Sequence, residues 1–131
     1  MRLSEAIRLG ALLSPPGKDG YMDGPTRCAL GAASDAVGIP ATFVYDSMRM
    51  GIDYVAMDDR WSILHRQVRM PTRPWRMAFV DCVIWSLNDC CDWTREQIAD
   101  WVETIEQEHQ CEASASPQVE HAVAVVVAKS R

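Results

Sequence analysis

The strongest structural signal in this sequence is a helix start at residue 94. Thr94 and Gln97 form a Thr-x-x-Gln capping box, in which each side chain bonds the backbone N–H of the other residue. Trp93 stands where it can pack on Ile98. Apolar residues then recur at helical spacing, at Ile98, Trp101, Val102 and Ile105. The pattern predicts a helix from residue 94 to about residue 108 with one buried face.

Three further segments carry helix signals. The predicted helices cover residues 4–13, 27–37 and 75–87. Ser4 and Thr26 supply caps for the first two, and Pro74 fits the first turn of the third. Gly38 suits the left-handed position after the second helix. That helix consists mainly of small residues, so we expect a neighbouring helix to approach it closely, near the centre of the fold.

Residues 41–72 are harder to interpret. The three- and four-residue spacing of Trp61, Leu64 and Val68 favours a helix over residues 58–69. With 131 residues, the chain is expected to form one domain. We therefore expect a mainly α fold, a compact single domain of four or five helices over residues 1–110. A linker and C-terminal tail over residues 111–131 follow, with a short strand or no fixed structure.

The cysteines indicate the compartment. There are five, which is an odd number, and Cys90 and Cys91 are adjacent, so the set is a poor disulfide framework. The first residues lack the pattern of a signal peptide, and the longest apolar run, residues 122–128, is too short to span a bilayer. We expect a reduced, cytoplasmic protein with no membrane segment.

Two motifs together resemble those of small phage and bacterial proteins of unknown function. The first is a Cys-x-Leu-Gly helix start, here Cys28-Ala29-Leu30-Gly31. The second is a Leu-Asn-Asp turn followed by an Ile-Ala-Asp-x-Val-Glu helix, here Leu87-Asn88-Asp89 and Ile98-Ala99-Asp100-Trp101-Val102-Glu103. The match covers about 30 residues. The resemblance implies a compact, mostly helical protein, often encoded by a phage or prophage, with no known activity to transfer.

Several residues are candidates for chemistry. Cys28 lies near a predicted helix N-terminus, where the helix dipole lowers a thiol pKa, and His65 or His109 would be its base. Cys82, Cys90 and Cys91, with His109 and Cys111, are candidate metal ligands, but their spacing does not match the close pairs of zinc sites. We expect these cysteines to be unligated and the protein to need no cofactor. A cysteine-dependent enzyme or metal-binding protein is the alternative.

Charge is divided unevenly along the chain. Residues 60–76 hold five arginines, two tryptophans and no acid, whereas residues 81–112 hold nine acids and one arginine. Arginine interleaved with tryptophan can bind single-stranded nucleic acid, here through Arg66, Arg69, Arg73, Trp75 and Arg76. We favour the simpler interpretation, in which the basic segment lies against the acidic helix and is partly paired with it.

The acidic helix suggests a protein partner. Glu103, Glu106 and Glu108 flank the predicted apolar stripe, and exposed ion pairs contribute little stability. We therefore expect these carboxylates to lie at a partner-binding surface, where charge would steer a basic protein. The expected function is that of a small non-enzymatic protein acting through protein–protein interaction. A role in modulating a host system rests on the family resemblance alone.

Overall fold

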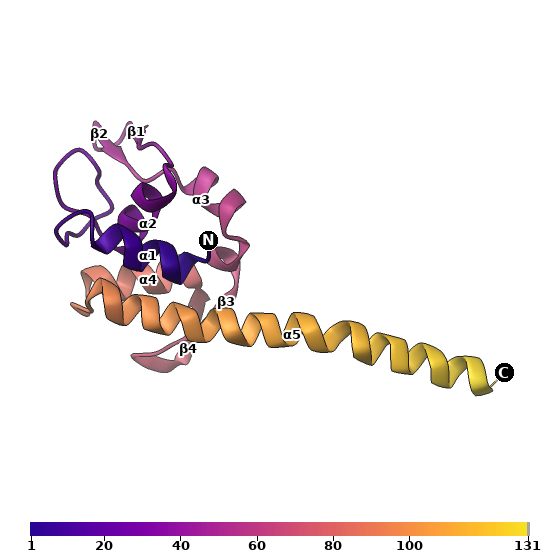
Figure 1. Ribbon diagram of the computed structural model, residues 1–131. Helices are drawn as coiled ribbons and strands as arrows, with labels where there is room; N and C mark the ends of the chain where they lie inside the picture. Colours follow the sequence, from indigo (N-terminus) through magenta and orange to yellow (C-terminus); the bar gives the residue numbers. More distant parts are fainter. Residues whose placement is uncertain (131) are drawn as a thin grey trace.

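The protein is a mixed α/β domain. The computed structural model describes residues 1–130, and the side chains of residues 1–113. Within that part, five α-helices and a 3-10 helix are joined by two small antiparallel sheets (Figure 1). The elements are α1 (Leu3–Ala11), α2 (Ala29–Val37), β1 (Thr42–Val44), β2 (Arg49–Gly51), α3 (Tyr54–Arg60), η1 (Ser62–His65), β3 (Gln67–Met70), β4 (Arg73–Phe79), α4 (Val80–Asp89) and α5 (Arg95–Ser130). The two sheets make the expectation of a mainly α fold wrong.

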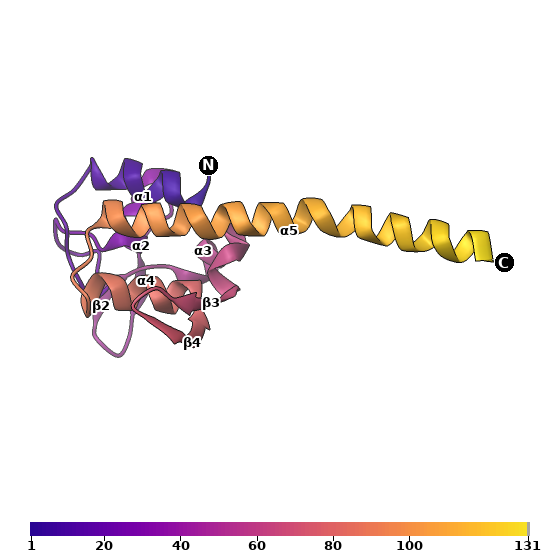
Figure 2. The ribbon, with the colours of Figure 1, turned by 90° about the horizontal axis from the view of Figure 1, so that it is seen from below.

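Helices α1 and α2 pack at very short range. A Cβ atom added to Gly10 of α1 would lie 1.8 Å from the carbonyl oxygen of Ala32 in α2. The prediction that the small residues of α2 admit a close neighbour is therefore confirmed. Along its other side α1 lies against the first half of α5 (Figures 1 and 2). The first and last helices of the domain thus share one core.

The helix ends differ in part from those predicted. The residue before α1 is Arg2, and Ser4 is buried inside the helix instead of capping it. Cys28, not Thr26, caps α2, because its Sγ accepts the N–H of Gly31 at 3.4 Å. Gly38 does take the left-handed conformation after α2, with φ at 74°. Helix α1 begins at Leu3, one residue before the predicted start, and its Leu3 and Ile7 side chains are buried.

The middle of the chain contains a hairpin where helices were predicted. Trp61, Leu64 and Val68 are all buried, but they belong to the end of α3, to η1 and to β3. Their helical spacing arises from three successive short elements, so the predicted helix over residues 58–69 is wrong. The helix predicted over residues 75–87 is α4, which begins only at Val80 because residues 73–79 form strand β4.

The start of α5 matches its prediction. The Thr94 hydroxyl accepts the N–H of Gln97 at 3.1 Å, and the Gln97 side chain accepts the N–H of Thr94 at 2.9 Å. Ile98, Val102 and Ile105 are buried. The helix continues to Ser130. The predicted end near residue 108 is wrong, because the helix extends beyond the last residue of the apolar stripe, Ile105. The division of the chain into residues 1–110 and 111–131 stays a prediction.

None of the described helices, α5 included, is both long enough and apolar enough to cross a bilayer.

Candidate interaction surface

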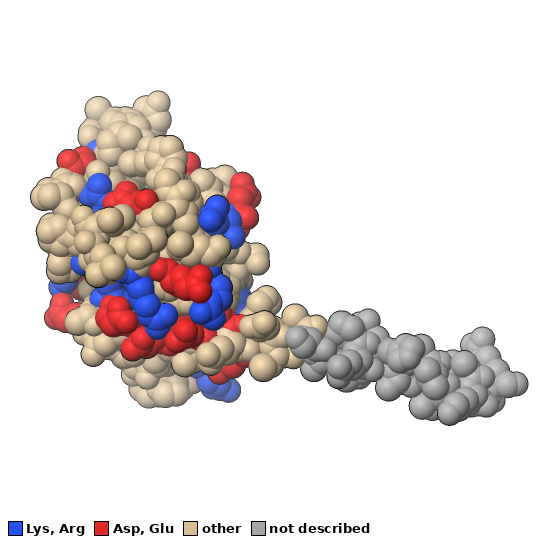
Figure 3. Space-filling view, in the orientation of Figure 1, with Lys and Arg blue, Asp and Glu red and all other residues tan. Residues whose placement is uncertain are grey.

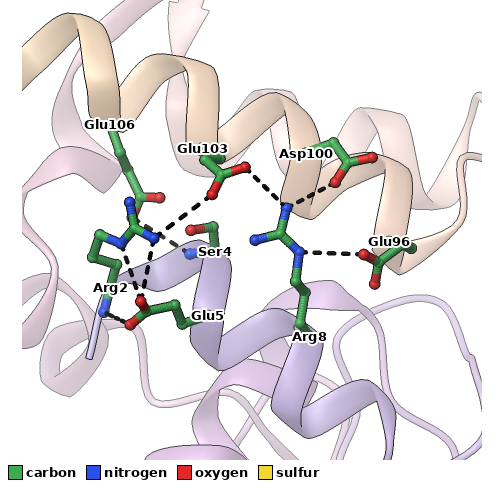
Figure 4. A network of polar contacts seen from close by, with 8 residues as sticks. All are labelled: Arg2, Ser4, Glu5, Arg8, Glu96, Asp100, Glu103 and Glu106. Atoms are coloured by element: carbon green, nitrogen blue, oxygen red, sulfur yellow. Dashed lines mark hydrogen bonds and ion pairs between the residues drawn. The ribbon is translucent and has the colours of Figure 1, made fainter.

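The acidic side of α5 is occupied by arginines of α1 (Figure 4). The Arg8 guanidinium lies 2.7 Å from a carboxylate oxygen of Asp100, 3.2 Å from Glu96 and 3.3 Å from Glu103. The bond to Asp100 is the main reason why the pKa of Arg8 is raised above its ordinary value. Arg2 also lies 3.6 Å from Glu103. Figure 3 shows the resulting band of interleaved acidic and basic side chains where α1 meets α5.

The three carboxylates predicted to bind a partner have different surroundings. Glu103 is paired with Arg8 of α1 and with Arg2, the residue before α1. One oxygen of Glu106 accepts the N–H of Ser4 at 3.4 Å, and the other is buried without a hydrogen-bond partner among the described residues. Of the three, Glu108 alone is exposed, and the other two are partly buried. Two of the three therefore hold α1 and α5 together, and the structure does not gather the set on one open face.

The basic segment is separate from this acidic side, apart from one residue. Arg66 lies 2.7 Å from Glu112 and 2.7 Å from the Nδ1 atom of His109. Arg69, Arg73 and Arg76 have no carboxylate within 4.0 Å among the described residues. The Pro74 carbonyl accepts a hydrogen bond from Arg69 at 2.9 Å. The expected pairing of the two charged segments is therefore confined to Arg66.

The same hairpin exposes large apolar side chains. Trp75 is 79% exposed, Met77 51% and Phe79 42%, and Trp85 on the neighbouring helix α4 is 50% exposed. Large apolar residues exposed close together on a monomer often mark an interaction site. Sequence reasoning found Trp75 and missed the other three. Apolar residues stand at every second position, at Trp75, Met77 and Phe79, and this spacing in the sequence is typical of a strand.

A hollow separates the hairpin from α4. It encloses about 690 Å³ and is lined by Arg73 and Arg76 from β4, Asp81, Cys82 and Trp85 from α4, and Tyr54 from α3, among others. Burial raises the pKa of Tyr54 to about 12 and also raises that of Cys82. The volume lies within the usual range of ligand clefts, which bind through apolar walls and a few polar groups.

Cys28 has the surroundings of a structural residue. Its thiol is buried, and burial raises its pKa, which opposes the activation expected of a nucleophile at a helix start. The two candidate bases have other partners: His65 lies 2.7 Å from Asp58, and His109 contacts Arg66. The cysteine-enzyme alternative therefore gains no support from the geometry.

The other thiols also lack a metal-binding arrangement. All five cysteines are free, and Cys82, Cys90 and Cys91 line the same hollow. Within the described part of the chain, however, no three Cys, His, Asp or Glu side chains converge as metal ligands would. The metal-binding alternative gains no support either.

A second hollow of about 560 Å³ lies at the start of α5, beside Lys18, Asn88 and Arg95. Arg95 is buried and donates to the carbonyl oxygens of Ala11 at 3.3 Å and Ser14 at 2.7 Å. Lys18 is paired with Asp92 at 2.6 Å. Lys18 is therefore paired, whereas Arg95 has only carbonyl acceptors, and its Nη1 atom is buried without a hydrogen-bond partner among the described residues.

No protein-family model matches the chain, and no curated protein or solved structure matches it either. The structure does bring two of the quoted motifs into contact, since the Asn88 side chain accepts the N–H of Ala29 at 3.1 Å. This contact ties the start of α2 to the end of α4. The resemblance to small phage and bacterial proteins stays a prediction.

Proposed function

We propose that this protein acts by binding a protein partner through the surface that β3, β4 and the adjoining side of α4 present. We call this the hairpin surface, and its members are Arg69, Arg73, Trp75, Arg76, Met77, Phe79 and Trp85. One observation carries the proposal: Arg69, Arg73 and Arg76 have no carboxylate partners among the described residues and belong to the same hairpin as the exposed Trp75, Met77 and Phe79, and the exposed Trp85 lines a hollow together with Arg73 and Arg76. Tryptophan, methionine, phenylalanine and arginine are the residue types enriched at the centres of protein interfaces.

The location of the charges favours this surface over the one first expected. Glu103 and Glu106 contact α1, so a partner would have to compete with the fold for them. Arg73 and Arg76 form no ion pair within the described part of the fold, so a partner can bind them without competition. The sequence predicted a basic partner for the acidic helix. A partner that binds the basic hairpin surface should instead be acidic, with apolar groups between its charges. Cytoplasmic location and a phage or prophage origin remain expectations that accompany this proposal.

The proposal is tested by comparing three versions of the full-length chain. Tagged wild type, Arg73→Glu/Trp75→Ala/Arg76→Glu and Glu108→Lys are used to capture proteins from host lysate, with circular dichroism as a check of folding. We expect the hairpin variant to lose the partner that the wild type retains, while Glu108→Lys keeps it. Loss of capture in Glu108→Lys together with retention in the hairpin variant would assign binding to α5 and contradict the proposal.

Nucleic-acid binding is the second candidate function. Arg69, Arg73, Arg76 and Trp75 provide charge and one stacking surface for a single strand. The net charge of −5 and the apolar side chains of Met77 and Phe79 favour a protein instead. A fluorescently labelled single-stranded oligonucleotide separates the two. Binding that weakens steeply with salt and disappears in the hairpin variant would replace the protein partner with nucleic acid.

A further inference from the structure

Strand β4 has an open edge. The sheet contains β3 and β4 only, so within the described part of the chain β4 (Arg73–Phe79) bonds to a neighbouring strand on one side and to none on the other. The strand is seven residues long and its side chains are mostly exposed. Its pairing with β3 is regular over residues 77–79, and the register then shifts, so that residues 74–76 form a bulge with no partner in β3. An edge of this length presents a row of backbone donors and acceptors to which another chain can bond.

The register identifies which backbone groups lie on that edge. Val68 pairs with Ala78 and Arg69 with Met77, while the N–H of Val80 donates to the carbonyl of Arg66 at 3.0 Å. In an antiparallel ladder, hydrogen-bonded pairs alternate with pairs whose N–H and C=O groups point away from each other. Ala78 is therefore bonded to Val68, and Met77 directs its N–H and C=O to the open edge. The N–H of Phe79 points the same way.

The side chains of β4 differ between its two faces. Met77 and Phe79 lie on one face and are exposed, and Trp75, in the bulge, is exposed as well. Arg76 and Ala78 lie on the other face, which is turned towards the hollow beside α4. A strand laid along the edge would therefore meet apolar side chains on one face and Arg76 on the other. Opposite charges placed across such a pair are favourable, and like charges are not.

We propose that the partner contributes an extended segment of alternating acidic and apolar residues, which adds to the open edge of β4 as a third strand. This inference rests on the proposed function and specifies its binding mode. Backbone bonds to Met77 and Phe79 supply affinity, and the alternating side chains supply selectivity. The apolar residues of the segment cover Trp75, Met77 and Phe79, and an acidic residue faces Arg76.

A second copy of this chain is a poorer occupant of the same edge. Antiparallel self-pairing centred on Arg76 places two guanidinium groups opposite each other. Arginine and proline on an edge are also features that prevent identical edges from associating. An acidic segment neutralises the arginine that repels a second copy.

The experiment uses the full-length protein and a defined probe, the acetylated heptapeptide Glu-Val-Glu-Val-Glu-Val-Glu carrying a fluorophore. The matched control peptide has lysine in place of each glutamate. Anisotropy measures binding, and amide hydrogen exchange followed by NMR locates it. We expect the acidic peptide at saturation to slow the exchange of the Met77 and Phe79 amides about ten-fold or more. The amide of Ala78, which already bonds to Val68, provides the internal reference.

Two copies of the probe with N-methyl groups on alternate residues test the backbone bonds directly. One carries N-methyl groups on the valines and the other on the glutamates, so one of them loses the donors that face β4. We expect that peptide to bind about ten-fold or more weakly and the other to bind normally. Arg73→Glu/Arg76→Glu should abolish binding of the acidic peptide and favour the lysine peptide, with circular dichroism confirming the fold.

The outcomes separate this inference from the function on which it rests. If the acidic peptide binds and depends on Arg73 and Arg76, but neither N-methylated copy is weakened and the Met77 amide stays unprotected, strand addition is wrong and the hairpin surface stands. Equal binding of the lysine peptide overturns the charge selection. Failure of the acidic peptide to bind at millimolar concentration overturns the inference, while the capture experiment decides the proposed function independently.

Discussion

The α1–α5 interface and the hairpin surface contain the same kind of side chain in opposite situations. Arg8 is largely covered and touches three carboxylates, whereas Arg76 is exposed and touches none among the described residues. The packing differs in the same way. At Gly10, α1 leaves no room beside α2 for even one methyl group, whereas the hairpin surface exposes four large apolar side chains. The contrast shows which charges maintain the fold and which are available to a ligand.

The most severe test of the packed side is Gly10→Ala. The added Cβ would lie 1.8 Å from the Ala32 carbonyl oxygen, so α1 and α2 must move apart. We expect a loss of about 3 kcal/mol in the free energy of unfolding, measured by urea denaturation. Gly24→Ala is the control, because nothing lies within 4 Å of its Cβ position, and it should change stability by less than about 0.5 kcal/mol. Equal midpoints for the two variants would contradict the close contact.

The electrostatic side of the comparison is tested by removing one arginine from each region. Arg8→Ala leaves Glu96 and Asp100 without their cation and Glu103 with Arg2 alone, and we expect the loss of this network to cost about 1–2 kcal/mol. Arg76→Ala should change the free energy of unfolding by less than about 0.5 kcal/mol. High salt should reduce the Arg8 effect, because it screens the pairs. If Arg76→Ala cost as much as Arg8→Ala, the hairpin arginines would have a structural role.

A smaller effect is expected at the start of α5. Thr94→Ala removes the acceptor of the Gln97 N–H and should lower stability by about 1 kcal/mol. Thr104→Ala lies on the same helix, where the hydroxyl donates to the Trp101 carbonyl, and is the matched control. Since alanine is the better helix former, this control should be neutral or slightly stabilising. Thermal melts of both variants give the comparison.

The smallest effect concerns His65, which lies beside the hairpin surface. It is paired with Asp58 and lies edge-on to Phe79 at the end of β4, with ring centroids 6.0 Å apart. The hydrogen bond to Asp58 raises the pKa of His65. A pKa raised by folding means that the contribution to stability is complete below the ordinary value of about 6.5 and is lost as the pH rises through the folded pKa.

Asp58→Asn should therefore bring the pKa of His65 back towards its ordinary value in an NMR titration. The stability difference between wild type and this variant should shrink between pH 5.5 and pH 8.5. A His65 pKa unchanged by the substitution would show that Asp58 is not its partner in solution.

Sequence patterns predicted local structure well where the signals were local. The capping box of Thr94 and Gln97, and Gly38 after α2, depend on a few neighbouring residues and were found correctly. The hairpin was missed for two physical reasons. Trp61, Leu64 and Val68 imitate a helix because three short elements bury them in turn. The apolar residues that alternate in β4 are exposed, whereas alternation usually marks a strand because the apolar residues lie on its buried face.

The candidate site was harder to foresee than the fold. Both charged segments were identified from composition, but their pairing depends on which helix lies beside α5. That helix is α1, whose two arginines are too few and too distant in sequence to draw attention. Glu103 and Glu106 contact α1 or the residue before it, whereas Glu108 is exposed, and the role of the three in binding a partner stays a prediction. The basic residues were assigned to pairing when most of them remain unpaired within the described part of the chain.

The contact between α1 and α5 also has a consequence for synthesis. Arg8 and Asp100 are 92 residues apart in the chain, so the first helix leaves the ribosome long before its carboxylate partners exist. At usual elongation speeds of about 5–20 residues per second, that interval lasts roughly 5–20 seconds. Throughout it, the apolar side of α1, with Leu3 and Ile7, has no α5 to cover it. The nascent chain in this interval therefore exposes an apolar helix face, and its native core closes only after α5 has been synthesised.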